Sequence, residues 1–258
     1  LLTELTSAFV AALQSKGTAQ LLNLPTTGIE LTCGLTDICD CKYLILGKDK
    51  SMGDNILFGP QKLNDAKATL WTLDWKAPFR ATNFLYMTTQ QIKYVIVSSN
   101  EPVIKQFETK ILRDLPTTLK TQVVTNIQEI NLDTEQTRVI FLTDFDQQLL
   151  ENKARGKEVS AVNLQPPNKA TFYTRKNNNE QFSKAELPFI SDPQAEQTIN
   201  DAMIYAAIFS NDPRLYKCHL QTAYKKLAYV ASIILARAEE LQKETDTQAK
   251  TQCVYPTE

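Results

Sequence analysis

Two carboxylates that follow an apolar segment have the type and spacing that chemistry could use. Asp144 and Asp146 come shortly after residues 139–142, Val-Ile-Phe-Leu. Such an unbroken apolar run is typical of a buried strand. Open α/β sheets bind ligands at the carboxyl ends of their strands, and paired carboxylates there can hold Mg²⁺. One candidate activity is therefore a metal-dependent hydrolase or phosphotransferase that uses these two residues.

The same string resembles the first motif of haloacid-dehalogenase-type phosphatases, in which Asp-x-Asp follows an apolar strand. Residues 95–100 are similar to that family's second motif, an apolar strand that ends in Ser or Thr. The two motifs stand here in the reverse order, glutamines occupy the position of the usual threonine, and no later aspartate pair follows. We therefore interpret Asp144 as the N-cap of a helix over 145–154, with Asp146 placed favourably against the helix dipole.

Two shortages argue against most other catalytic schemes. The chain has seven glycines and a single histidine, His219. Histidine is the usual general base at neutral pH, and glycine-rich loops of the kind that cradle phosphates are absent. On its predicted helix His219 falls with Thr222 and Lys226 on the polar side, so we expect it to be solvated. The sequence thus favours a protein that is not an enzyme and predicts no cofactor and no bound metal.

The five cysteines form no familiar pattern. They are Cys33, Cys39, Cys41, Cys218 and Cys253. The odd count does not make a closed disulfide framework, and the spacing of the first three matches no standard zinc site. We expect buried free thiols, at least two of them in the group Cys33, Cys39 and Cys41. A Cys33–Cys39 or Cys33–Cys41 disulfide in a periplasmic protein, or a metal or redox site, are the alternatives.

Composition limits the partners. The formal net charge is −1 and the pI is about 6.0, so no basic surplus favours nucleic acid. The longest apolar stretch, 228–236, is interrupted by Ser232 and is too short to span a bilayer. We expect a cytoplasmic protein whose partners are other protein subunits. A periplasmic location would require a signal peptide removed before Leu1.

The middle of the chain predicts an α/β (or α+β) fold with a central mixed sheet. Residues 93–98 and 138–143 are apolar runs that we expect to be neighbouring buried strands. A strand–helix–strand order over 93–124, and again over 138–164, predicts crossover helices. We assign residues 1–190 to this α/β body.

Weaker patterns predict the remaining elements of the body. They are a helix over 3–16, strands over 29–35, 38–46, 68–75, 81–88, 119–124, 159–164 and 171–173, and a polar loop over 177–188.

The last part of the chain predicts a helical hairpin over 191–258. Asp192 and Asp212 each precede a proline, and an Asp-Pro pair is typical of an N-cap followed by the first helical residue. The expected helices span 193–210 and 213–243. The short connection between them indicates that they lie antiparallel.

The second of these helices has a wide apolar face. Its main stripe, at steps of four and three, consists of Tyr216, Leu220, Ala223, Leu227, Val230 and Ile234. We expect the central part of this face, around 227–234, to pack in the core. Its flanks are expected to contact another protein, with Tyr216, Leu220 and Leu241 as the candidate contact residues.

Together these patterns predict a non-catalytic structural or adaptor component of a multi-protein assembly. Besides the hydrolase, a small-molecule-binding sensor domain is an alternative. Its ligand would lie at the strand ends near residues 98–100 and 143–144, where polar side chains follow the two apolar strands.

Overall fold

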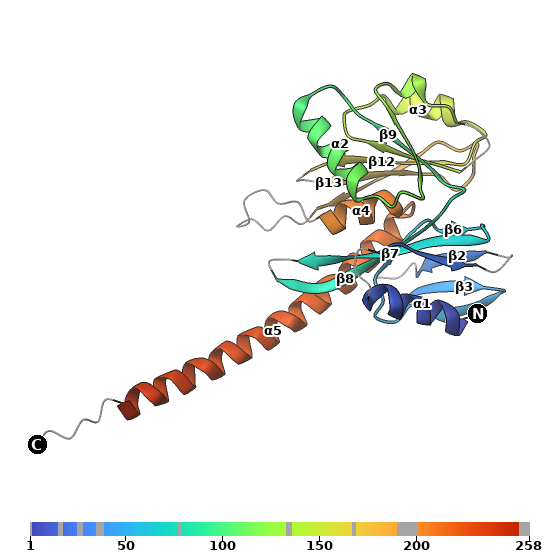
Figure 1. Cartoon of the computed structure of the whole chain (residues 1–258). Coiled ribbons are helices and arrows are strands. Elements are labelled where there is room, and N and C mark those ends of the chain that lie inside the picture. Colours follow the sequence, from blue (N-terminus) through green and yellow to red (C-terminus); the bar gives the residue numbers. More distant parts are fainter. Residues whose placement is uncertain are drawn as a thin grey trace, which may run out of the picture.

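The computed structural model describes the chain except for residues 1, 15–17, 25–27, 35–38, 77–78, 133–135, 167–168, 190–200 and 253–258. The described residues form a mixed α/β structure with five α-helices and three sheets. Two sheet-containing halves lie above and below a central helix, α4, and the long helix α5 extends away from them (Figure 1).

A six-stranded mixed sheet forms the upper half. Its order is β10 (Lys120–Val124), β9 (Lys93–Val97), β11 (Thr137–Phe141), β12 (Val159–Gln165), β13 (Lys169–Thr174) and β14 (Ser183–Pro188). The first four strands are parallel, and β13 and β14 are antiparallel. The two apolar runs predicted to be neighbouring central strands are β9 and β11, which pair directly and are buried. That prediction is confirmed.

Helices cover both faces of this sheet. On one face α3 (Gln147–Ala154) buries Leu150 against Val139 and Phe141. On the other face α2 (Pro102–Asp114) buries Ile111 in the core that also holds Ile140. Successive side chains along each strand point to opposite faces of the sheet, so alternate residues of one strand pack in different cores.

The lower half contains α1 (Leu2–Gln14) and two four-stranded sheets. One has the order β1 (Gln20–Asn23), β7 (Lys67–Lys76), β8 (Arg80–Thr89) and β5 (Leu57–Phe58), and the other has the order β4 (Lys48–Ser51), β3 (Cys41–Ile45), β2 (Ile29–Cys33) and β6 (Lys62–Leu63). The side chains of β7 alternate between two cores: Trp71 and Trp75 lie in the core that also contains residues of α4 and α5. Leu70, on the opposite face, packs in the core that contains α1.

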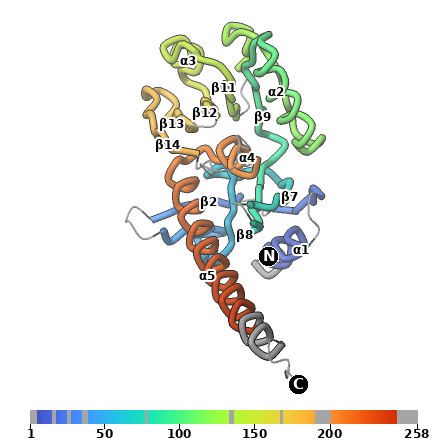
Figure 2. Tube along the Cα trace, turned by 90° about the vertical axis from the view of Figure 1, so that its left-hand side faces the viewer, coloured from blue at the N-terminus to red at the C-terminus, as the bar shows by residue number. Residues whose placement is uncertain are grey.

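Helix α4 (Asp201–Phe209) lies between the two halves (Figure 2). Every residue from Ala202 to Phe209 is buried, and a helix that is apolar all round is typical of such a central position. Since residues 190–200 lie outside the described part, the predicted start of this helix at 193, its Asp192 cap and the division of the body at residue 190 stay predictions.

The buried side chain of Arg138 fixes the end of α4. From β11 its guanidinium donates to the carbonyl oxygens of Ala207, Ile208 and Ser210, at 2.9, 3.0 and 2.6 Å, and to that of Ala161 at 3.1 Å. The last carbonyl oxygens of a helix have no intrahelical N–H donors, and the C-terminal end of the helix dipole is negative. A guanidinium there both donates hydrogen bonds to these oxygens and places a positive charge at the negative end of the dipole. Burial lowers the pKa of Arg138 to about 9, which leaves it charged at neutral pH.

Several local predictions were wrong. Residues 183–188, expected in a loop, form the edge strand β14, whose side chains alternate between exposed and half-buried and so give little apolar signal. Asn100, which precedes Pro102 by two residues and would suit an N-cap, does not cap α2: the N-cap is Glu101, and its side chain makes no capping bond. Strands β1, β4, β5 and β6 have two to four residues each and were not predicted.

Replacement of Arg138 should destabilise the whole chain. Arg138→Met keeps much of the side-chain volume but leaves buried carbonyls without donors, so we expect a loss of at least about 3 kcal/mol in the free energy of unfolding. Arg155→Met is the matched control, because Arg155 is exposed. Urea denaturation of both variants measures the difference. Equal stabilities would show that α4 does not depend on this guanidinium.

Candidate functional site

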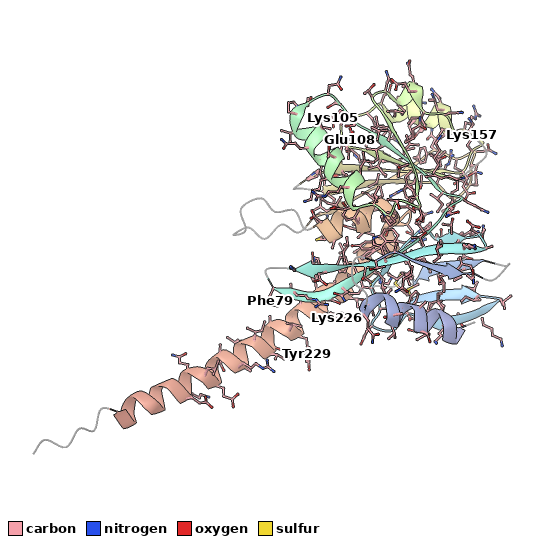
Figure 3. The ribbon with its side chains drawn as sticks, in the orientation of Figure 1. Phe79, Lys105, Glu108, Lys157, Lys226 and Tyr229 are labelled. Atoms are coloured by element: carbon pink, nitrogen blue, oxygen red, sulfur yellow. A yellow bond between two sulfur atoms is a disulfide. The ribbon has the colours of Figure 1, made fainter. Side chains whose placement is uncertain are left out.

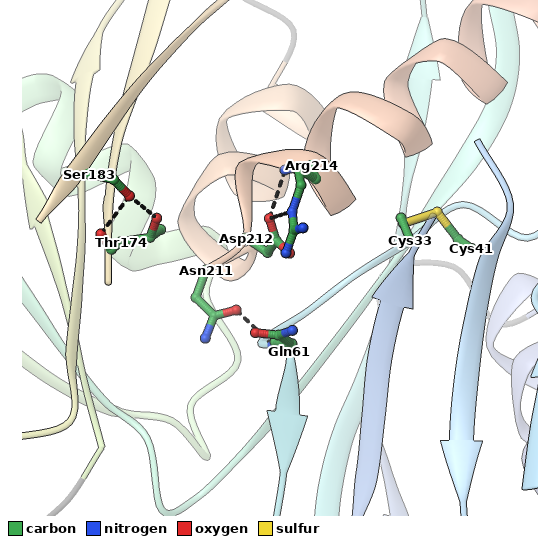
Figure 4. Close-up of polar contacts among 8 residues, drawn as sticks. All are labelled: Cys33, Cys41, Gln61, Thr174, Ser183, Asn211, Asp212 and Arg214. Atoms are coloured by element: carbon green, nitrogen blue, oxygen red, sulfur yellow. Dashed lines mark hydrogen bonds and ion pairs between the residues drawn. A yellow bond between two sulfur atoms is a disulfide. The ribbon is translucent and has the colours of Figure 1, made fainter. Parts of the chain in front are cut away.

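Helix α5 (Pro213–Gln252) begins at a well-defined cap. The Asp212 carboxylate accepts a hydrogen bond from the Arg214 backbone N–H at 2.8 Å and pairs with the Arg214 guanidinium at 3.0 Å. Just before it, the Asn211 side chain accepts a hydrogen bond from the Gln61 backbone N–H at 2.7 Å (Figure 4). The Asp212-Pro213 signal is therefore confirmed, and these bonds set the position from which α5 extends.

A polar groove of about 790 Å³ lies beside this cap, between the β13–β14 strands and the β2–β6 region. Within it the hydroxyls of Thr174 and Ser183 form a hydrogen bond at 3.2 Å (Figure 4). Asp212 and Arg214, which also line the groove, form an ion pair with each other. These groups satisfy one another, so they do not by themselves demand a ligand.

The first turns of α5 join the two halves. The helix lies against β5 and β8, against β2, and against β14, which belong to three different sheets. The Tyr216 ring lies 5.9 Å from the ring of Phe58 and 5.1 Å from that of Phe172. Tyr216 and Leu220, which we expected to contact a partner, are buried in the chain's own core and are not available at the surface.

His219 is also buried, so the expectation of a solvated histidine was wrong. Its ring lies 5.6 Å from that of Phe58 in β5, a two-residue strand that gave no sequence signal and that covers this side of the helix. Burial lowers the pKa of His219 to about 3. The histidine is therefore neutral at physiological pH and is poorly placed to act as a general base.

Beyond residue 227 the surroundings of α5 change. The helix leaves the body, and Tyr229 lies on the part that projects (Figure 3). The exposed fractions of Tyr229, Leu235 and Leu241 are 69%, 62% and 62%, and those of Ile233 and Ile234 are 38% and 45%. We call residues 228–244 the projecting segment. The expectation was wrong in two parts: the Tyr216 flank is core, and Ile233 and Ile234 are exposed instead of packed in the core. Leu241 is exposed, and its contact with a partner stays a prediction.

One continuous stripe connects the buried and exposed parts of α5. Steps of four and three lead from Leu227 through Ala231, Ile234 and Ala238 to Leu241, on the same side of the helix that buries Tyr216 in the body. The surface that packs on the sheets thus continues, uncovered, along the projecting segment.

The cysteines are oxidised in this structure, so the expectation of free thiols was wrong for four of them. Cys33 and Cys41 stand directly opposite each other in β2 and β3 and form a disulfide, one of the alternatives that their spacing left open. Cys39 is bonded to Cys218 in α5. These two residues are 179 positions apart, and only the docking of α5 beside β2 brings them together. Cys253 lies outside the described residues.

Metal ligands gather at one place in the described part of the chain. The sulfurs of Cys33, Cys41 and Cys218 lie within 4.8 Å of one another. All three belong to disulfides, and a metal-binding cysteine must be a thiolate. In this oxidation state the cluster is covalent and offers no thiolate ligand.

The two carboxylates considered as magnesium ligands, Asp144 and Asp146, lie at the start of α3. The Asp146 side chain accepts hydrogen bonds from the backbone N–H groups of Gln148 and Leu149, at 2.8 and 3.2 Å, and is the N-cap of α3. Asp144, which we expected to be the cap, is exposed and lies before the helix, which begins later than predicted. Ser98 follows the neighbouring strand β9 and is buried.

Comparison with known protein families, with curated proteins and with solved structures finds no match to this chain. Among the described residues no helix is long and apolar enough to cross a membrane.

The buried histidine predicts a specific pH dependence. Burial lowers the pKa of His219 to about 3 in the folded chain, whereas the pKa of a histidine in an unfolded chain is about 6.5. At a pH between these two values only the unfolded chain binds a proton at His219, so the free energy of unfolding falls as the pH drops through this range. His219→Gln should remove up to about 1.4 kcal/mol per pH unit of this loss between about pH 6 and about pH 4. Urea denaturation across that range measures it. Parallel stability curves for parent and variant would contradict the assignment.

Proposed function

We propose that this chain is a non-catalytic component of a multi-protein assembly and that the projecting segment of α5 binds another protein. The observation that supports this is the exposed part of the apolar stripe, on which the exposed fractions of Ile234 and Leu241 are 45% and 62%. A contiguous apolar surface on a projecting helix is characteristic of an interaction site.

The projecting segment also has a reason to need a partner. Helices without tertiary contacts are marginal in water, and most helical stability in proteins comes from packing of an apolar face. Covering a Leu or Ile side chain fully contributes about 1.5–3 kcal/mol. A partner seated on Ile234, Leu235 and Leu241 would therefore supply stabilisation that the body does not give to this part of α5.

The stripe favours a helical partner. Large and small residues alternate along it, from Leu227 and Ala231 to Ile234, Ala238 and Leu241. Alternation of this kind lets the side chains of a second helix fit between the large residues. Because the stripe runs on from the buried face of α5, such a helix would also meet the edge of the body.

The hydrolase alternative has less support. Its candidate residue Asp146 is engaged as a helix cap, and His219 is buried and neutral. A sensor function is favoured only by the position of residues 98–100 and 143–144 at the same edge of adjacent parallel strands. Neither alternative has a feature as pronounced as the exposed stripe.

The disulfides support a change in the proposed compartment. Disulfides persist in oxidising environments and are rare in the cytosol. With four cysteines paired, we propose that the protein works in the periplasm or another oxidising compartment instead of the cytoplasm.

Charges placed on the stripe should break the assembly and leave the chain folded. Ile234→Asp and Leu241→Asp change exposed positions of the stripe, so we expect circular dichroism and the unfolding midpoint to stay close to those of the parent. Binding should weaken at least about 30-fold, because a charge would be buried in the interface. Ser232→Asp adds the same charge at an exposed polar position on the far side of α5 from the stripe and is the matched control.

The measurement uses a photo-reactive side chain at Gln242, an exposed position at the border of the stripe, in cells that express the chain. Discrete protein adducts should form with the parent and with Ser232→Asp, and should be lost with the two stripe variants. Adducts that are equally strong in all variants, or absent from the parent, would contradict the proposal.

A further inference from the structure

We propose that the four clustered cysteines form a thiol–disulfide exchange site whose substrate is an external thiol or dithiol. The two disulfides lie side by side, because the sulfurs of Cys33 and Cys41, which are bonded to each other, lie within 4.8 Å of the sulfur of Cys218. Cys218 is bonded in turn to Cys39. A thiolate released at Cys218 would therefore stand next to a second disulfide. This inference is independent of the function proposed for α5.

Exposure sets the direction of the first step. Cys39 is half-buried, whereas the exposed fraction of Cys218 is only 7%. An external thiolate can thus reach the sulfur of Cys39 more readily than that of Cys218. Its attack forms a mixed disulfide on Cys39, breaks the Cys39–Cys218 bond, and leaves the electron pair on Cys218 as a thiolate.

In the second step Cys218 exchanges with the Cys33–Cys41 disulfide. The Cys218 thiolate attacks the sulfur of Cys41, a Cys41–Cys218 bond forms, the Cys33–Cys41 bond breaks, and Cys33 leaves as a thiolate that takes a proton from water. Attack on Cys41 is favoured because the leaving sulfur is then Cys33, which is half-buried, whereas Cys41 is only 8% exposed. A more solvated leaving thiolate is the more stable one.

The steps balance. One external thiol enters, and the products are the mixed disulfide on Cys39, the Cys41–Cys218 disulfide and one thiol on Cys33, so the number of disulfides is unchanged. If the external molecule is a dithiol, its second thiol releases Cys39 as a thiol and the dithiol is oxidised. Between the two steps Cys218 is a free thiolate, so α5 is released from Cys39 and is then attached to Cys41 in β3.

Two double variants separate this site from a pair of inert structural bonds. Both carry Cys253→Ser, so that the remaining cysteines are those of the cluster. Cys39→Ser leaves Cys218 as a permanent thiol beside the Cys33–Cys41 bond, and we expect a Cys41–Cys218 peptide, with Cys33 alkylated, in mass spectra of the acid-quenched native protein. Cys218→Ser is the matched control. It leaves the thiol on Cys39, outside the three-sulfur group, and should keep Cys33–Cys41 intact.

The parent protein gives a second test that does not depend on how the variants fold. Oxidised full-length chain is mixed with limiting reduced glutathione, quenched and mapped. The proposal predicts glutathione on Cys39 together with the Cys41–Cys218 bond. It is overturned if glutathione attaches first to Cys33 or Cys41, if both original bonds resist glutathione in the folded chain, or if Cys39→Ser contains only Cys33–Cys41 and a free Cys218.

Discussion

The buried guanidinium of Arg138 is the interaction on which the arrangement of the chain depends. It reaches from the centre of the upper sheet to the last carbonyls of α4, including that of Ser210. Only Asn211 and Asp212 separate that carbonyl from the first residue of α5. The position of Arg138 in β11 therefore sets where α4 ends and where α5 begins. A charge so deeply buried is tolerated because four carbonyl oxygens and the negative end of a helix dipole replace the water it loses.

From that starting point α5 has two different roles along one face. Its first turns bury Tyr216 between Phe58 and Phe172 and so join strands of the lower and upper halves. The Cys39–Cys218 disulfide adds a covalent link from the same turns to the lower half. After residue 227 the face has no such cover, although its large and small apolar residues continue in the same register. We propose that a partner protein covers the apolar face of the projecting segment, as the sheets cover the apolar face of the first turns.

The sequence allowed prediction of what depends on local pattern. The apolar runs of β9 and β11 indicated adjacent buried strands, and Asp212-Pro213 marked the start of α5. Contacts made by weakly patterned elements were not predictable. His219 has polar neighbours on its own helix, and only the two-residue strand β5 makes its site apolar. The partner of Cys39 lies 179 residues away, so spacing alone could not reveal it. Helical periodicity identified the apolar stripe of α5, but the point at which the helix leaves the body depends on tertiary packing. For this reason Tyr216 was wrongly expected at the surface and Ile234 wrongly in the core.

Hydrogen exchange along α5 tests the central claim most directly. In the isolated chain, the amides of residues 216–223 should be protected by the core, and those of the projecting segment should exchange rapidly, because an uncovered helix opens easily. In the assembly purified under native conditions, residues 228–244 should become protected while residues 216–223 change little. Exchange in the projecting segment that is equally fast in the isolated chain and in the assembly would contradict the claim.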